Sequence, residues 1–196
     1  MKPIGLMSQE ELAAFVCQLL DAAGIKVTLT GGACVAIWTD GEYLSRDLDF
    51  IEQGTVPRRA LRAELTKHGF REQGRHFWHP DSEYVIEFPS GPLAVGNEPV
   101  RSHSERKTST GVLRLRSPVD CVKDRLSAYF HWNDHQALEQ AVAVARRQST
   151  DLEASLWRFL QPGALQATAL AEDLRAWLSR RVERSRCVRR WARITQ

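Results

Sequence analysis

Several features that would assign a chain to a particular class are missing from this sequence of 196 residues. It contains no run of about 18 apolar residues, so no transmembrane helix is expected. Residues 1–5 lack the long apolar stretch that begins a signal peptide. The sequence also has no internal repeat and no low-complexity segment. These absences favour a cytoplasmic globular protein over a membrane, exported or repeat protein.

A Cys-x-x-Cys pair is absent as well. The cysteines, Cys17, Cys34, Cys121 and Cys187, are scattered along the chain. Redox motifs and zinc sites usually place cysteines close together in sequence, and secreted domains use them in disulfide frameworks. We therefore expect reduced thiols, three of them in the core.

The composition is that of a folded protein with an uneven charge distribution. Hydrophobic residues make up 43% of the chain, which is enough for a core, and the formal net charge is +3. Residues 175–193 carry eight arginines against the single acid Glu183. Such a segment could meet RNA, DNA or an acidic partner protein. A solvated helix face is the alternative interpretation.

Hydrophobic periodicity divides the chain into a mixed first part and a helical second part. Ser8 and Glu11 have capping-box spacing ahead of an apolar helical pattern. Helices are expected at 8–23, 31–39 and 57–68, and strands at 25–30, 46–52, 70–73, 76–78, 83–88 and 112–116. After Ser117 the pattern is helical only, at 118–129, 134–147, 151–160 and within 164–193. This order predicts an α+β fold with a small mixed sheet.

The most informative pattern is the pair Asp47 and Asp49, fifteen residues beyond Gly31 and Gly32. Residues two apart on a strand point to the same face, so both carboxylates should project side by side. Two carboxylates held this close repel each other unless a cation lies between them. Mg²⁺ suits such an all-oxygen site. The glycine pair should end a strand and open a helix, where backbone N–H groups can approach a phosphate.

A third carboxylate would strengthen this metal site. Glu87 is the preferred candidate, because it is expected on a strand face opposite Ile86 and Phe88. Glu83 shares that face and is the rival candidate. A merely solvent-facing acidic strand is the alternative for the whole pattern.

These residues resemble the nucleotidyltransferase superfamily of the DNA polymerase β type. The resemblance is carried by Gly31-Gly32, the intervening helix, and Asp47-Leu48-Asp49 followed by an acid on a later strand. It is greatest for minimal bacterial members, including the toxins of toxin–antitoxin systems. It implies a small mixed β-sheet nucleotidyltransferase fold flanked by helices, with a nucleotidyltransferase core at 1–116 and a helical C-terminal region at 117–196. The family's serine after the first glycine is Gly32 here.

The resemblance also implies an activity and its cofactor. Asp47, Asp49 and Glu87 would be the catalytic residues and would hold Mg²⁺ or Mn²⁺. Gly31, Gly32 and Ser45 would contact the nucleotide. An NMP group would move from an NTP to an acceptor hydroxyl, with release of pyrophosphate. RNA, especially tRNA, is the favoured acceptor; a protein hydroxyl or a small molecule such as an aminoglycoside stays open.

A cationic side chain after Ser117 is a further nucleotide-binding candidate. Pro118 and Asp120 fit the first turn of a helix that carries Lys123 and Arg125. A lysine or arginine facing the cleft could neutralise phosphates. Residues two apart do not share a helix face, so at most one should do so, and Lys123 is preferred. An ordinary solvated charge is the alternative.

Three histidine- or charge-rich segments are interpreted as structural. His131 and His135 could bind metal on one helix face, but Asn133 is a good N-cap, so the two should lie on different elements in a junction packed by Trp132. His76 and His79 are expected to be hairpin residues. Residues 102–109 are expected to form a solvated loop, although they could border a nucleic-acid acceptor.

Two other functions remain open at this point. The chain could keep the fold without turnover, as a binding module such as the neutralising partner in a two-protein system. It could also be an RNA-binding protein led by the arginine-rich segment. In each case no membrane partner is expected.

Overall fold

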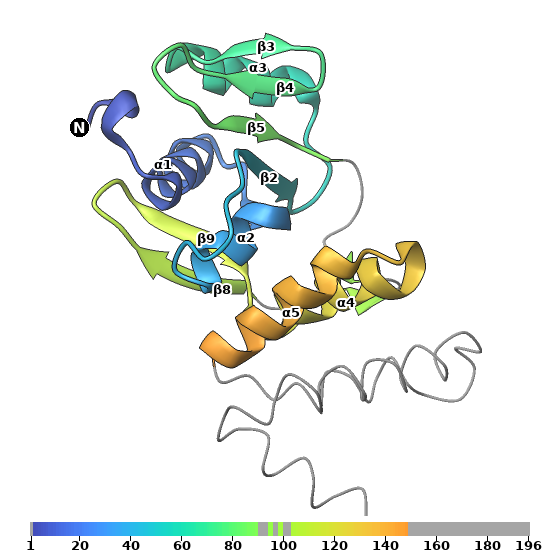
Figure 1. The fold of residues 1–196 in the computed structure, drawn as a ribbon. Coiled ribbons are helices and arrows are strands. Elements are labelled where there is room, and N and C mark those ends of the chain that lie inside the picture. The colour runs from blue at the N-terminus through green and yellow to red at the C-terminus, as the bar shows by residue number, and fades with distance from the viewer. Residues whose placement is uncertain (1, 90–93, 96–97, 100–102, 149–196) are drawn as a thin grey trace, which may run out of the picture.

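A mixed sheet of seven strands forms the centre of this chain (Figure 1). The computed structural model describes residues 2–89, 94–95, 98–99 and 103–148. The strands lie in the order β3-β4-β5-β2-β1-β9-β8. Their bounds are β1 Val27–Thr30, β2 Asp47–Glu52, β3 Arg71–Gln73, β4 His76–Trp78, β5 Val85–Glu87, β8 His103–Lys107 and β9 Val112–Arg116. A separate ribbon pairs β6 (Ala94–Val95) with β7 (Glu98–Pro99).

Helices surround this sheet in the described part of the chain. They are a short 3₁₀ turn, η1 Ile4–Leu6, and the helices α1 Gln9–Ala22, α2 Gly31–Trp38, α3 Arg58–Lys67, α4 Pro118–Trp132 and α5 His135–Arg147. Helix α1 packs on β1 and β9 and contacts α3, whereas α2 packs on β1 and β2 and contacts α4 and α5. Figure 1 shows α4 and α5 side by side, to one side of the sheet. The predicted α+β class is confirmed; the helices expected after residue 148, the arginine-rich segment and Cys187 lie outside the described residues.

The helix starts follow from local hydrogen bonds that the sequence encodes. Ser8 accepts from the Glu11 N–H while Glu11 accepts from the Ser8 N–H, which completes the predicted capping box. Ser117 caps α4 by accepting from the Asp120 N–H, directly before Pro118. Strand β9 therefore ends and α4 begins within two residues of Ser117, where the sequence predicts the change from strands to helices.

One face of the sheet is apolar and packs into the core. Leu29, Leu48, Phe50, Phe77 and Ile86 are fully buried on neighbouring strands. Cross-strand pairing explains why they meet, because Leu29 lies opposite Phe50, Leu48 opposite Ile86 and Phe77 opposite Ile86. Burial of this face fixes the register, and with it the residues that point to the other face.

The structure also bears on the predictions for the cysteines and for membrane-spanning helices. Cys17, Cys34 and Cys121 are buried free thiols, as predicted. Among the described residues, no helix has the length and apolar character needed to cross a membrane.

Three local expectations are wrong. Residues 103–107, predicted to lie in a solvated loop, form edge strand β8, because its backbone pairs with β9 while its polar side chains stay at least partly exposed. Trp132, expected to pack the α4–α5 junction, is 78% exposed. Asn133 ends α4 in the left-handed conformation, and Asp134 caps α5 instead. The prediction that His131 and His135 lie on different elements is confirmed.

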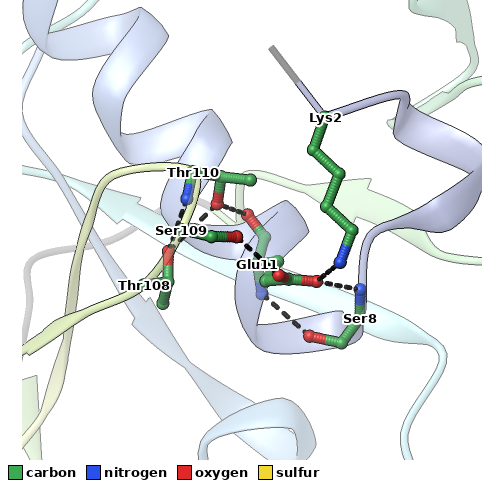
Figure 2. A network of polar contacts seen from close by, with 6 residues as sticks. All are labelled: Lys2, Ser8, Glu11, Thr108, Ser109 and Thr110. Atoms are coloured by element: carbon green, nitrogen blue, oxygen red, sulfur yellow. Dashed lines mark hydrogen bonds and ion pairs between the residues drawn. The ribbon is translucent and has the colours of Figure 1, made fainter.

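A polar network fastens the β8–β9 turn to the start of α1 (Figure 2). The Glu11 carboxylate accepts from Ser109 Oγ at 2.6 Å and from Lys2 Nζ. Thr110 Oγ1 donates to the Glu11 carbonyl at 2.6 Å. The Ser109 and Thr110 contacts join residues almost a hundred positions apart. Hydrogen bonds from Lys2, Ser109 and the Ser8 N–H lower the pKa of Glu11 to about 2.

Candidate functional site

Three carboxylates lie on the sheet face opposite the core. Asp47 and Asp49 are two residues apart on β2, and Glu87 lies on the neighbouring strand β5. The two strands are parallel, and their register places Asp49 directly beside Glu87 and Asp47 beside Val85. Asp47 is exposed and Asp49 is half-buried. Leu48, which lies between the two aspartates on β2, is buried in the core, so the pleat of the strand places both acids on the other face.

Gly31 lies against this cluster. It has a φ of +66° at the point where β1 ends and α2 begins. A β-carbon added at this position would stand 2.1 Å from Asp49 Oδ2. Thr30, the residue before it, is the direct cross-strand partner of Asp49 and donates from Oγ1 to the Asp49 carbonyl at 3.2 Å. The glycine bend and the paired acids therefore form one local unit.

The electrostatics of this unit favour a cation. Burial raises the pKa of Asp49 to about 6, and the charges of Glu87 and Asp47 add to the increase. Arg125 on α4 acts in the opposite direction and helps to keep Asp49 ionised. A carboxylate that is disfavoured by two like charges is one that a bound divalent cation would stabilise.

Glu87 already has cationic or proton-bearing neighbours. Its Oε2 lies 3.3 Å from Arg75 Nε, and its Oε1 lies 3.0 Å from His76 Nδ1. Glu83, the rival candidate, precedes β5; its side chain is 62% exposed and lies 3.7 Å from Arg46. Within the described ranges, no three histidine, cysteine, aspartate or glutamate side chains are gathered closely enough to hold a metal ion as they stand.

Gly32 and Ser45 face each other beside the bend. A β-carbon on Gly32 would stand 3.1 Å from Ser45 Oγ and 3.3 Å from Ser45 Cβ. Ser45 Oγ also donates to the Asp47 carbonyl at 3.0 Å. The space next to Gly32 is therefore occupied by the hydroxymethyl group of Ser45, directly ahead of the strand that carries the acids.

Arg125 is the α4 cation whose charge acts on Asp49. Asp124 accepts from Arg125 Nη2 at 2.5 Å and Nε at 3.1 Å, and also from Arg116 Nη1. Although burial works against its charge, Asp124 raises the pKa of Arg125 and holds its guanidinium in place. Lys123 Nζ instead lies 3.7 Å from Asp120 Oδ1, within the same helix.

Both cations of α4 are mostly buried, since 14% of the Lys123 side chain and 20% of the Arg125 side chain is exposed. Lys123 therefore stays a prediction, and Arg125 is added as the residue whose charge acts on Asp49. The sequence gives no signal for Arg75 and His76, because only strand pairing and the turn beside it place them next to Glu87.

Comparison with protein families finds no matching family, and comparison with curated proteins finds no similar one. Solved structures do match. An antigenic nucleotidyltransferase-like protein from Paracoccidioides brasiliensis is 16% identical, with a TM-score of 0.55, over 87% of this chain and 95% of that one. The antibiotic-resistance factor ANT(2″)-Ia, in complex with adenylyl-2″-tobramycin, is 15% identical with a TM-score of 0.45, over 73% of this chain and 98% of that one. The lincosamide antibiotic adenylyltransferase LnuA, bound to lincomycin, is 13% identical with a TM-score of 0.46, over 70% and 98%.

The match to the Paracoccidioides protein spans nearly the whole of both chains. At this identity it establishes the fold alone. The chain therefore has a nucleotidyltransferase-type fold, as the sequence resemblance implies.

Proposed function

We propose that this chain is a nucleotidyltransferase that moves an NMP group from an NTP to an acceptor hydroxyl. The observation that supports this most directly is the placement of Asp47, Asp49 and Glu87 on one sheet face, with Asp49 against Gly31. Burial, with the nearby charges of Glu87 and Asp47, raises the pKa of Asp49, whereas a base paired with Asp49 in a structural ion-pair network would lower it.

The reaction is a substitution at the α-phosphorus of the NTP. The acceptor oxygen forms a bond to that phosphorus, the bond to the bridging oxygen breaks, and pyrophosphate leaves. Arg125, fixed by Asp124, neutralises charge on the phosphates. Backbone N–H groups after Gly31 and the hydroxyl of Ser45 contact phosphate oxygens. Glu87 accepts the proton of the attacking hydroxyl.

The donor set fits Mg²⁺, with Mn²⁺ as a substitute. Asp47 and Asp49 would hold the ion, and Glu87 would join them after exchanging its contacts with Arg75 and His76. Such an ion, when bound, supplies charge neutralisation on the triphosphate and activates the attacking hydroxyl.

RNA, and tRNA in particular, is the acceptor we favour, because residues 175–193 are rich in arginine. A protein hydroxyl and a small molecule such as an aminoglycoside are the competing acceptors. A role as the toxin of a toxin–antitoxin pair is consistent with the sequence resemblance and predicts that expression of the active chain arrests growth.

The test uses each of the four α-³²P-labelled NTPs with total RNA and with lysate protein. Label transferred by the wild type and lost in Asp47→Ala/Asp49→Ala supports the proposal. Glu83→Gln is the matched control for Glu87→Gln, because both remove one acidic charge from the same stretch of chain. Equal transfer by the wild type and the double variant would refute the proposal.

A binding module without turnover is the second candidate. Glu87 contacts Arg75 and His76 instead of the aspartates, and Gly32 lacks the family's serine hydroxyl. This candidate predicts no transfer, no NTP affinity, and tight binding of a protein encoded beside it. NTP affinity measured by calorimetry separates the two candidates even when the acceptor is unknown.

A further inference from the structure

The sheet face that carries the acids extends beyond them toward the β3 edge. Directly paired residues of a sheet share a face, so the register identifies its members. Glu87 pairs with His76, Val85 with Trp78, Trp78 with Arg71, and His76 with Gln73. From β2 to the edge strand β3, this acceptor-side face is therefore formed by Asp47 and Asp49, then Val85 and Glu87, then His76 and Trp78, and finally Arg71 and Gln73.

On strands β3 to β5, the acceptor-side face is partly exposed to solvent, whereas the opposite face is buried. Arg71 and Gln73 are exposed, and Trp78 is half-buried. On the opposite side of the same strands, Phe77 and Ile86 are fully buried. Strands β3 to β2 are three strand spacings apart, or roughly 14 Å, so the face is wide enough for several linked groups to lie across it.

The chemistry of the open part is aromatic and basic. The Arg71 guanidinium lies over the Trp78 ring, with its carbon 5.4 Å from the ring centroid. Arg75, in the β3–β4 turn, is 78% exposed, and His76 is 39% exposed. A flat aromatic ring with a stacked guanidinium is a surface on which nucleobases stack, and exposed arginines pair with phosphates.

We infer that this face binds the terminal nucleotides of a single-stranded RNA and leads them to the carboxylates. A base would stack on Trp78 and Arg71 while the backbone passes Arg75 and His76. The β3–β4 part of this face has positive charge and a π surface together, which complements a single strand with its bases exposed. This inference deepens the proposed function, because it names the described surface that would hold its acceptor.

The experiment measures binding of a short, mixed-sequence, 5′-fluorescein-labelled single-stranded RNA to the full chain by fluorescence anisotropy. Neither NTP nor Mg²⁺ is present, so the result does not depend on turnover. The variants are Trp78→Leu, Trp78→Phe and Arg71→Ala. Trp132→Leu controls for loss of an exposed tryptophan, and Lys107→Ala removes one exposed positive charge on β8, at the opposite edge of the sheet.

We expect Trp78→Leu to weaken RNA binding about tenfold, and Trp78→Phe to retain most of the affinity. Arg71→Ala should also weaken RNA binding but leave the slope of log affinity against log salt nearly unchanged, because Arg71 stacks with the base and does not contact a phosphate. Circular dichroism melting of each variant identifies any that misfolds; Arg71 is exposed, so its variant tests the inference if Trp78→Leu unfolds.

Wild-type affinity in Trp78→Leu and Arg71→Ala, or losses no larger than those of the two controls, would overturn the inference. So would equal binding of the same sequence as a duplex, whose bases are stacked away from the face. The two proposals fail in different assays. If only the proposed function is wrong, no label is transferred, but the differences in RNA affinity between wild type and variants remain.

Discussion

The α-carbon of Gly31 lies so close to the Asp49 carboxylate that a β-carbon there would stand 2.1 Å from Oδ2. This relationship joins the end of β1 to the acidic strand β2, which pairs with it antiparallel. A positive φ and the absence of a side chain are both needed at position 31, for different reasons. The positive φ allows the chain to turn into α2, and the missing side chain leaves room for the Asp49 carboxylate.

Gly31→Ala should therefore do more damage than its backbone strain alone. A non-glycine residue in the left-handed region costs roughly 1–2 kcal/mol. Gly24, with a φ of +75°, has no atom within 4 Å of an added β-carbon, so Gly24→Ala isolates that cost. We expect Gly31→Ala to lower the free energy of unfolding further and to abolish NTP affinity. Urea denaturation and calorimetry of both variants check this; equal effects of the two substitutions would contradict it.

Asp49 should make the fold less stable as the pH rises. Its pKa is raised from 3.8 to about 6, by burial first and then by Glu87 and Asp47. The folded state thus holds a proton that the unfolded state has already released, so stability falls between about pH 4 and pH 6. The expected loss is about 2 kcal/mol, since each pKa unit is worth about 1.4 kcal/mol and partial exposure screens the charge.

Asp49→Asn removes the titrating group and should flatten this pH dependence while stabilising the protein at neutral pH. Urea denaturation of both proteins across this range provides the measurement. Excess MgCl₂ at neutral pH should stabilise the wild type and leave Asp49→Asn unchanged. If the wild type instead gains stability relative to Asp49→Asn between pH 4 and pH 6, Asp49 is not buried among like charges.

The parts of this site that the sequence predicts are those set by residues close together in the chain. Period-two alternation places Asp47 and Asp49 on one face, because that pattern is local. Capping at Ser8 is likewise local and is predicted correctly. The contact of Glu87 with Arg75 and His76 depends on the register of two strand pairs, which no local pattern specifies. Strand β8 is missed because its polar residues carry no apolar alternation, and only pairing with β9 makes it a strand.

The Glu11 network predicts acid sensitivity (Figure 2). Contacts with Lys2, Ser109 and the Ser8 N–H lower the pKa of Glu11 from 4.5 to about 2. The folded state therefore favours the ionised carboxylate, and its contribution to stability is present above about pH 4.5 and is lost as the pH falls toward 2. Glu11→Gln should lower the melting temperature at neutral pH and reduce this acid dependence.

Glu64→Gln is the matched control for Glu11→Gln. Glu64 forms an ion pair with its helix neighbour Lys67, at 2.6 Å on α3, and such surface pairs contribute little to stability. Its melting curve should match the wild type across the same pH range. If Glu11→Gln melts like this control, the network does not fasten the β8–β9 turn to α1.

Substitution of Arg125 and of Lys123 should have different effects on NTP affinity. Both lie on α4, but the charge of Arg125 acts on Asp49, whereas Lys123 is 3.7 Å from Asp120. Loss of a hydrogen bond to a charged group costs roughly 1.5–3 kcal/mol, so Arg125→Ala should weaken NTP binding about 10- to 100-fold. Lys123→Ala should change it far less.

Arg125→Lys separates charge from geometry. Asp124 contacts Arg125 through two nitrogens, Nε and Nη2, which a lysine cannot reproduce, so this variant should recover only part of the affinity. Calorimetric titration with a non-hydrolysable NTP analogue measures all three variants without turnover, and melting curves confirm that each is folded. A larger loss in Lys123→Ala than in Arg125→Ala would assign the phosphate contact to Lys123, the residue preferred from the sequence.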